Sequence, residues 1–276
     1  MSFEHRGRLP LDYHPVVYPG SVLRFRGPAP GRGLDAPFVL CLGGSETFGR
    51  FIHAPFAAQL DAALPLDVVN MGVMNAGLDV IFRDPAITAA LGRADAVVLQ
   101  VMGAQNMTNR FYSVHPRRND RFVKAATMLR TLYRDVDFTE FHFTRHLLTH
   151  LNALSPDRFG VVERELRAAW VARMKAFLDR VSVPVHLLWL SRRHPDEVPT
   201  GPVSRLGPDP LFIRPDMLAD VAGAAASLSI AVPPPQGPQS STRGMFFGAR
   251  EEAAARVLPG PDGHDLAARL LRPLLA

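Results

Sequence analysis

Residues 37–49 read Pro-Phe-Val-Leu-Cys-Leu-Gly-Gly-Ser-Glu-Thr-Phe-Gly and decide the fold of this chain. The apolar run has the length of a buried strand, and it ends in Gly43 and Gly44, which let the backbone turn sharply. Ser45 and helix-compatible residues follow. Open α/β sheets bind their ligands at the carboxyl ends of the strands. Ser45 is therefore the first candidate for a nucleophile, although a serine at such a turn also commonly caps the helix.

The rest of the chain repeats this strand-to-helix pattern. Apolar runs with strand character cover residues 38–42, 66–70, 96–101 and 185–190, with a weaker fifth at 228–232. Continuous hydrophobicity is typical of strands buried on both faces of a parallel sheet. Helical patterns lie between them at 51–64, 85–91, 121–134, 138–151 and 155–180. The order predicts an α/β fold, a three-layer α/β/α sandwich with a central, mostly parallel five-stranded sheet.

Local signals mark the starts of two of these helices. Asp137 with Glu140 forms a capping-box-like start, and Ser155 before Pro156 is typical of a helix N-terminus.

Two regions fall outside the alternation of strands and helices. Residues 1–35, rich in Pro, Gly and Arg, are expected to form an extended lead-in to a single domain over residues 36–276. Six prolines in residues 194–218 predict a long loop, interpreted as a lid over the strand ends.

Composition excludes several classes of protein. The chain has 276 residues, is 47% hydrophobic and carries a formal charge of +5, supplied almost entirely by arginine. Nucleic-acid binding is not expected, because no helix-turn-helix or RNA-binding signature accompanies the charge. Its single cysteine, Cys41, allows no intrachain disulfide, and neither a secretory signal nor a membrane span is predicted. We expect a cytoplasmic protein, and no metal site is predicted.

Three further segments lie where an α/β active site would place them. Residues 70–77 follow the second strand, residues 102–109 follow the third, and residues 259–264 precede a final amphipathic helix at 265–275. Together with residues 43–45, these segments resemble the four sequence blocks of the SGNH (GDSL-type) hydrolase superfamily, in the same chain order. The residues that match are Ser45, Gly72, His264 and, after Gly103, Asn106 or, without an insertion, Gln105.

The resemblance implies a flavodoxin-like domain and serine chemistry. Ser45 would attack an ester carbonyl and His264 would accept its proton, while the N–H groups of Ser45 and Gly72 and the amide of Asn106 or Gln105 would stabilise the oxyanion. One departure concerns the acid that orients the histidine, because Pro261 stands where the superfamily has aspartate. The site then either works as a Ser45–His264 dyad or has lost hydrolytic activity.

A basic and aromatic segment, residues 109–121, follows the third block directly. Guanidinium groups bind carboxylates and phosphates bidentately, and aromatic faces pack on sugar rings. The segment is interpreted as a site for an anionic glycan or for the phosphates of an acyl donor such as coenzyme A. The alternative is a solvated face paired with Asp120 and Asp135. The residues concerned are Arg110, Tyr112, His115, Arg117, Arg118 and Arg121.

Two functions from different classes therefore remain open. One is an SGNH-like esterase or O-acyltransferase acting on an acylated carbohydrate or similar polar ester, with no cofactor beyond a possible acyl donor. The other is a non-catalytic protein of the same fold that binds an anionic saccharide or a protein partner through an arginine-rich pocket. A sulfotransferase-like enzyme is disfavoured, because residues 43–47 lack the length and the lysine of a phosphate-binding loop.

Overall fold

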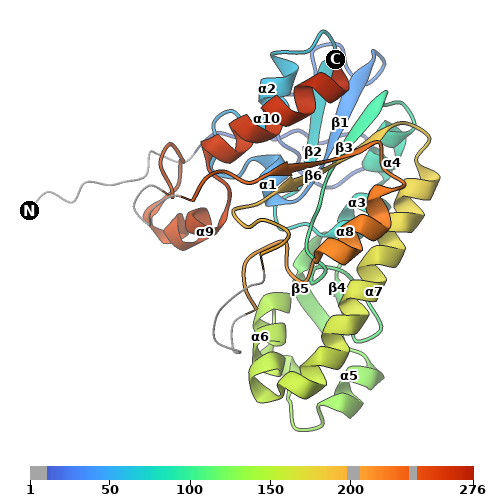
Figure 1. Cartoon of the computed structure of the whole chain (residues 1–276), viewed down its shortest axis with the longest axis vertical. Coiled ribbons are helices and arrows are strands. Elements are labelled where there is room, and N and C mark those ends of the chain that lie inside the picture. Colours follow the sequence, from blue (N-terminus) through green and yellow to red (C-terminus); the bar gives the residue numbers. More distant parts are fainter. Residues whose placement is uncertain (1–10, 198–205, 236–240) are drawn as a thin grey trace, which may run out of the picture.

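The computed structural model describes residues 11–197, 206–235 and 241–276 and contains the predicted five-stranded parallel sheet (Figure 1). Gly43 at the end of the first strand lies opposite Gly72 at the end of the second. Numbered along the chain, the sheet strands have the order 2-1-3-4-5, which is that of flavodoxin-like doubly wound folds. In spatial order they are β2 (Asp67–Gly72), β1 (Phe38–Gly43), β3 (Ala96–Gln100), β6 (Val185–Leu190) and β7 (Ser227–Ala231).

Helices cover both faces of this sheet, as predicted for a three-layer sandwich. Alternate side chains of each strand point to opposite faces and so enter two separate apolar clusters. One face packs against α2 (Phe56–Asp61) and α10 (Pro261–Leu275). The other packs against a larger set, which consists of α3 (Leu78–Arg83), α4 (Pro85–Leu91), α7 (Pro156–Arg180) and α8 (Pro215–Ala222).

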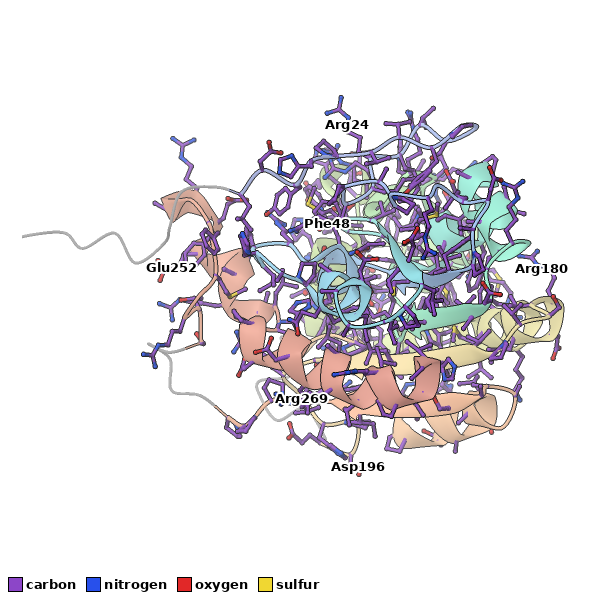
Figure 2. The ribbon with its side chains drawn as sticks, turned by 90° about the horizontal axis from the view of Figure 1, so that it is seen from above. Arg24, Phe48, Arg180, Asp196, Glu252 and Arg269 are labelled. Atoms are coloured by element: carbon purple, nitrogen blue, oxygen red, sulfur yellow. The ribbon has the colours of Figure 1, made fainter. Side chains whose placement is uncertain are left out.

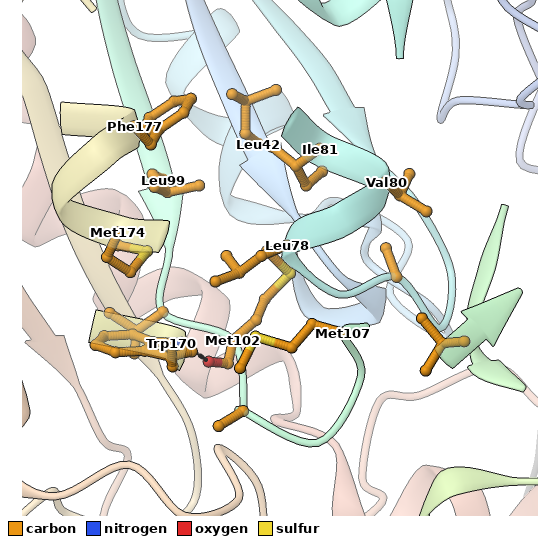
Figure 3. Packing of buried hydrophobic residues seen from close by; sticks show 14 of the residues in the cluster. Leu42, Leu78, Val80, Ile81, Leu99, Met102, Met107, Trp170, Met174 and Phe177 are labelled. Carbon is orange, nitrogen blue, oxygen red and sulfur yellow. Dashed lines mark hydrogen bonds between the residues drawn. The ribbon is translucent and has the colours of Figure 1, made fainter. Parts of the chain in front are cut away.

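The long helix α7 supplies much of the larger cluster. Its Trp170, Met174 and Phe177 belong to the same cluster as the strand residues Leu42 and Leu99, with Phe177 beside Leu99 and Trp170 beside Met102 (Figure 3). The Trp170 indole donates to the Met102 carbonyl oxygen at 2.8 Å, so the loop after β3 is fixed to this helix. The predicted N-terminus is confirmed, because the side chain of Ser155 accepts a hydrogen bond from the Arg158 N–H.

A hairpin, two α-helices and a short 3-10 helix extend beyond the sheet, in place of the helices predicted over residues 121–134 and 138–151. The hairpin of β4 (Tyr112–His115) and β5 (Arg118–Ala125) precedes α5 (Thr127–Leu132), η1 (Phe138–Glu140) and α6 (Thr144–Leu154). The helical expectation for residues 121–125 is wrong. Register shifts in the hairpin bury Asn119, Phe122 and Ala125, a spacing of three that resembles a helical face.

The predicted lead-in and lid are described by the structure only in part. Of the lead-in, residues 11–35 form no helix and no strand; they contain turns at 19–20 and 31–34 and one bridge between Val16 and Phe25, and residues 1–10 lie outside the described residues. Of the predicted lid, residues 198–205 lie outside the described part as well, and α8 begins at Pro215. Three short helices complete the fold, namely α1 (Ser45–Phe48), η2 (Ala249–Glu251) and α9 (Glu252–Val257).

The arginines that set the net charge lie largely on the surface. Arg24, Arg180 and Arg269 project outward in Figure 2, whereas Phe48 is enclosed and 2% exposed. Arg26 is an exception: it is buried, and its guanidinium donates to main-chain carbonyls of residues 48–53. Over the residues that the structure describes, a helix with the length and apolar character needed to cross a membrane is not found.

Candidate functional site

A cavity of about 200 Å³ lies beyond the carboxyl ends of β1 and β3. The strand order reverses between these two strands, since β1 continues to β2 on one side and β3 to β6 on the other. Such a switch point is where open α/β sheets bind ligands. Its polar lining is Ser45, Glu46, Arg50, Asn75, Gln100, Gln105, Asn106, Asp120 and Asp209, and its apolar lining includes Ala76, Val101, Met102, Pro210, Ala254, Val257 and Leu258.

Gln100, the last residue of β3, organises the turn that presents Ser45. Its Oε1 accepts from the N–H of Gly44 at 2.9 Å, and from the N–H and hydroxyl of Thr47 at 3.2 and 2.8 Å. A Cβ at Gly43 would lie 2.4 Å from the same Oε1, so only glycine fits there. The Gln100 Nε2 donates to Glu46 Oε2 at 2.8 Å. Sequence reasoning missed Gln100, whose only signal is a polar residue near the end of an apolar run.

Ser45 lies in the cavity wall and does not cap the helix that follows. Helix α1 has no side-chain cap, and the Ser45 Oγ instead accepts from the Asn75 N–H at 3.0 Å. Asn75 Oδ1 lies 3.5 Å from the same hydroxyl. The Ser45 hydroxyl is thus fixed to the segment after β2. The capping alternative from the sequence is wrong.

His264 lies outside the cavity lining. Helix α10 begins at Pro261, earlier than expected, so His264 falls inside its first turn and packs onto the start of α2. The ring is 1% exposed, stacks on Phe56 and accepts the Phe56 N–H at Nδ1 over 3.2 Å. Burial, helped by the Arg26 charge, lowers the pKa of His264 to about 3. Between these two described residues, Ser45 and His264, the expected hydrogen bond is not formed.

The remaining residues of the predicted catalytic set divide between cavity and core. Gly72 packs under α1, where a Cβ would lie 2.3 Å from the Phe48 nitrogen, and it does not line the cavity. Gln105 and Asn106 do line it. The Gln105 Nε2 donates to Asp209 at 2.8 Å, and Asn106 Oδ1 accepts the Thr144 hydroxyl at 2.6 Å. The structure therefore brings together Ser45, Gln105 and Asn106, but neither Gly72 nor His264.

The predicted arginine-rich pocket is not formed at this cavity. Arg110 pairs with Glu165 on α7, and Arg121 stacks over the Phe143 ring at 5.5 Å. Tyr112 is buried, with its hydroxyl donating to the Gln105 carbonyl oxygen at 2.6 Å. Within the described chain, none of the six residues proposed as an anion site, which also include His115, Arg117 and Arg118, lines the cavity. The hairpin explains this, because β5 places Asp120 in the cavity wall while its arginines are exposed.

The cavity is rich in carboxyl groups. Burial raises the pKa of Glu46, and the charge of Asp209 raises it further, while the Gln100 hydrogen bond opposes the shift. Burial also raises the pKa of Asp120, against the opposing charges of Arg118 and Arg121. Among the described residues, no group of three or more His, Cys, Asp or Glu side chains is placed to hold a metal ion.

Comparison with known proteins gives the family of the chain. It belongs to the family described as a domain of unknown function (DUF6473), whose model matches residues 1–276. No curated protein matches it.

Similar solved structures include a lipase from a goat rumen metagenome, at 13% identity and a TM-score of 0.36 over 86% of this chain and 96% of the lipase. A Lactobacillus plantarum protein is similar at 14% identity and a TM-score of 0.38, over 87% of this chain and 97% of that protein. A gut microbial diltiazem-metabolizing enzyme is similar at 12% identity and a TM-score of 0.40, over 86% of this chain and 46% of that enzyme. None of these likenesses bears on the activity of this chain.

Proposed function

We propose that the chain binds a small polyhydroxylated molecule, such as a saccharide, in the cavity at the switch point, without using Ser45 and His264 as a catalytic dyad. The observation that carries the proposal is the separation of these two residues. Ser45 faces the cavity, while His264 lies in the core, where its Nδ1 accepts the Phe56 N–H. A serine without a base is a poor nucleophile but a good hydrogen-bonding group.

The cavity offers both kinds of hydrogen-bonding group that sugar hydroxyls need. Glu46 and Asp209 supply acceptors, and Ser45 supplies a hydroxyl. Asn75 and Asn106 each have Oδ1 beside a protein hydroxyl, and among the described residues their Nδ2 donors have no protein acceptor. An apolar wall that contains Ala254, Val257 and Leu258 suits the C–H face of a sugar ring. This mixed lining, with its carboxyl groups, suits a polar ligand without negative charge and does not support the anionic ligand expected from the sequence.

The size of the cavity limits the ligand. About 200 Å³ corresponds to roughly six or seven water molecules at ~30 Å³ each. A single sugar ring is the largest saccharide unit that suits this space, and longer glycans would place their other rings outside it. The exposed Val257 marks the apolar side of the mouth.

A relationship to the SGNH superfamily remains part of this proposal. It is supported by the flavodoxin-like strand order and by the placement of Ser45 and Asn106 after β1 and β3 in one cavity. Under this proposal the family is a divergent branch in which the histidine block has become part of the core. Loss of the base would leave the binding site and remove the acyl transfer.

Ester hydrolysis or O-acyl transfer at Ser45 is the second candidate. It is favoured by the position of the Ser45 hydroxyl in the same cavity wall as the Asn106 amide, which would serve an oxyanion. Its base would have to be a cavity carboxylate, such as Glu46, because His264 is bound to Phe56. An acyl donor with phosphates, such as coenzyme A, would meet three carboxyl groups here and one arginine, Arg50, which is already paired with Glu251.

Titration calorimetry and covalent labelling distinguish the two candidates. We expect a panel of neutral monosaccharides to include a ligand whose affinity falls at least tenfold in Asn106→Leu, and a serine-directed fluorophosphonate to leave Ser45 unlabelled. Ser182→Ala, at an exposed serine remote from the cavity, is the matched control for Ser45→Ala. Labelling that disappears in Ser45→Ala but persists in Ser182→Ala would establish the second candidate. Absence of saccharide binding in the wild type would refute the first.

A further inference from the structure

We infer that the ligand of the switch-point cavity carries a protonated amine, as an amino sugar does, and that the carboxyl groups of the cavity bind that amine. The inference rests on the proposed saccharide binding and names the chemical class of the ligand.

The charges around the cavity are unequally compensated. Glu46, Asp120 and Asp209 line it, and the one lining cation among the described residues, Arg50, is bound to Glu251 at 3.0 Å. Asp209 is paired with Arg145 at 2.7 Å, outside the lining. Among the described residues, the side chain of Glu46 has one side-chain partner, the neutral Gln100 amide. An anionic ligand would therefore meet net repulsion, and a cation would meet attraction.

Asp120 is compensated weakly. Its nearest guanidinium, that of Arg118, lies 3.8 Å away with 48% of its side chain exposed, so solvent screens the pair. Its other oxygen, Oδ1, is buried and has no hydrogen-bond partner in the described part of the chain. A buried acceptor in this condition is unfavourable until a donor reaches it.

Gln105 provides a second acceptor, independent of the carboxylates. Its side chain lines the cavity and only 6% of the residue is exposed. Nε2 is bound to Asp209, which fixes the orientation of the amide, and Oε1 has no hydrogen-bond partner among the described residues. An ammonium group has three donors and no acceptor, and therefore matches a wall with surplus acceptors. A hydroxyl would supply one donor and bring two lone pairs of its own.

Binding of an amine should also release protons from the carboxyl groups of the cavity. Burial raises the pKa of both Glu46 and Asp120, so these groups hold protons more readily than exposed carboxyls. Asp209 faces Glu46 and acts in the same direction, whereas Arg118, Arg121 and His115 oppose the shift at Asp120. A bound ammonium favours the charged carboxylates and lowers these pKa values again. Amine affinity should therefore rise as the pH rises through the carboxyl pKa values of the empty cavity, and binding should release protons.

Calorimetric titration with glucosamine, glucose and glucuronate tests the inference, because the three sugars differ mainly in charge. We expect glucosamine to bind at least tenfold more tightly than glucose, and glucuronate more weakly than both. Asp120→Asn should reduce the preference for glucosamine over glucose at least threefold and leave glucose affinity nearly unchanged. Glu46→Gln is the second variant if Asp120→Asn fails to fold, and Asp216→Asn, at an exposed residue of α8, is the matched control.

The pH dependence is measured on the same protein. Repeating the glucosamine titration between about pH 5 and pH 7, in buffers of different ionisation enthalpy, should show proton release and rising affinity. Equal affinities for glucosamine and glucose would overturn the amine inference and leave saccharide binding intact. Failure of all three sugars to bind would instead refute the proposed function.

Discussion

Replacing His264 by Asn should remove an acid-sensitive element of the fold. The ring is buried against Phe56, and its Nδ1 accepts a main-chain N–H, so protonation would lose that hydrogen bond and bury a charge. Asparagine offers a side-chain oxygen to the same N–H and does not titrate. The comparison of wild type with His264→Asn therefore isolates the contribution of this one ring to stability.

The magnitude follows from the two pKa values. Burial lowers the folded-state pKa of His264 from 6.5 to about 3, so the unfolded chain takes up a proton at a higher pH than the folded chain. The contribution of neutral His264 to the free energy of unfolding is thus fully present above pH 6.5 and is lost as the pH falls toward 3. At about pH 4, roughly two and a half units below the unfolded pKa, the loss is about 3 kcal/mol at ~1.4 kcal/mol per unit.

Urea unfolding between about pH 7 and pH 4 measures this difference. Buried carboxyls affect both proteins equally, so we expect the wild type to lose about 3 kcal/mol more than His264→Asn over this range. Proton NMR of the His264 ring should show no titration above about pH 5. A ring that titrates between pH 6 and 7, or equal acid sensitivity in both proteins, would refute the assignment of His264 to the core. It would also restore His264 as a candidate base.

The sheet could be predicted from the sequence because its signal is local. Each of the five apolar runs is long enough to fill a strand and forms one in the structure, although β7, at the edge of the sheet, is only partly buried. The start of α7 at Ser155 and Pro156 was equally local, since a cap and a first-turn proline act within one helical turn. The hairpin at residues 112–125 was missed because its register shifts hide the alternation of a strand.

The candidate site could be predicted only where it depends on strand ends. Ser45 and Asn106 follow β1 and β3, and the parallel sheet necessarily places those ends side by side. His264 was misplaced because block order does not reveal where a helix begins. Proline is favoured at the first position of a helix, so α10 begins at Pro261 and not at residue 265. His264 therefore lies within the helix, on its buried face. Asp209 lies in a proline-rich loop, and its contacts with Gln105 and Arg145 span more than sixty residues, beyond any local pattern.

Two further substitutions test how the cavity wall is held. Tyr112→Phe removes the buried hydroxyl that donates to the Gln105 carbonyl, and it should lower the free energy of unfolding by about 1–2 kcal/mol in urea titrations; an unchanged value would mean that this bond is not formed. Gln100→Leu removes the acceptor of three hydrogen bonds at the turn before α1. Each is worth about 1 kcal/mol, so we expect a loss of about 3 kcal/mol, visible as a lower Tm in thermal unfolding. Gln59→Leu, on the outer part of α2, is the matched control and should change stability by less than about 1 kcal/mol, because its bonds to Ala54 and Asp265 are exposed. Equal effects of the two glutamine variants would show that Gln100 does not organise the turn, and the position of Ser45 would then have to be set by Asn75 alone.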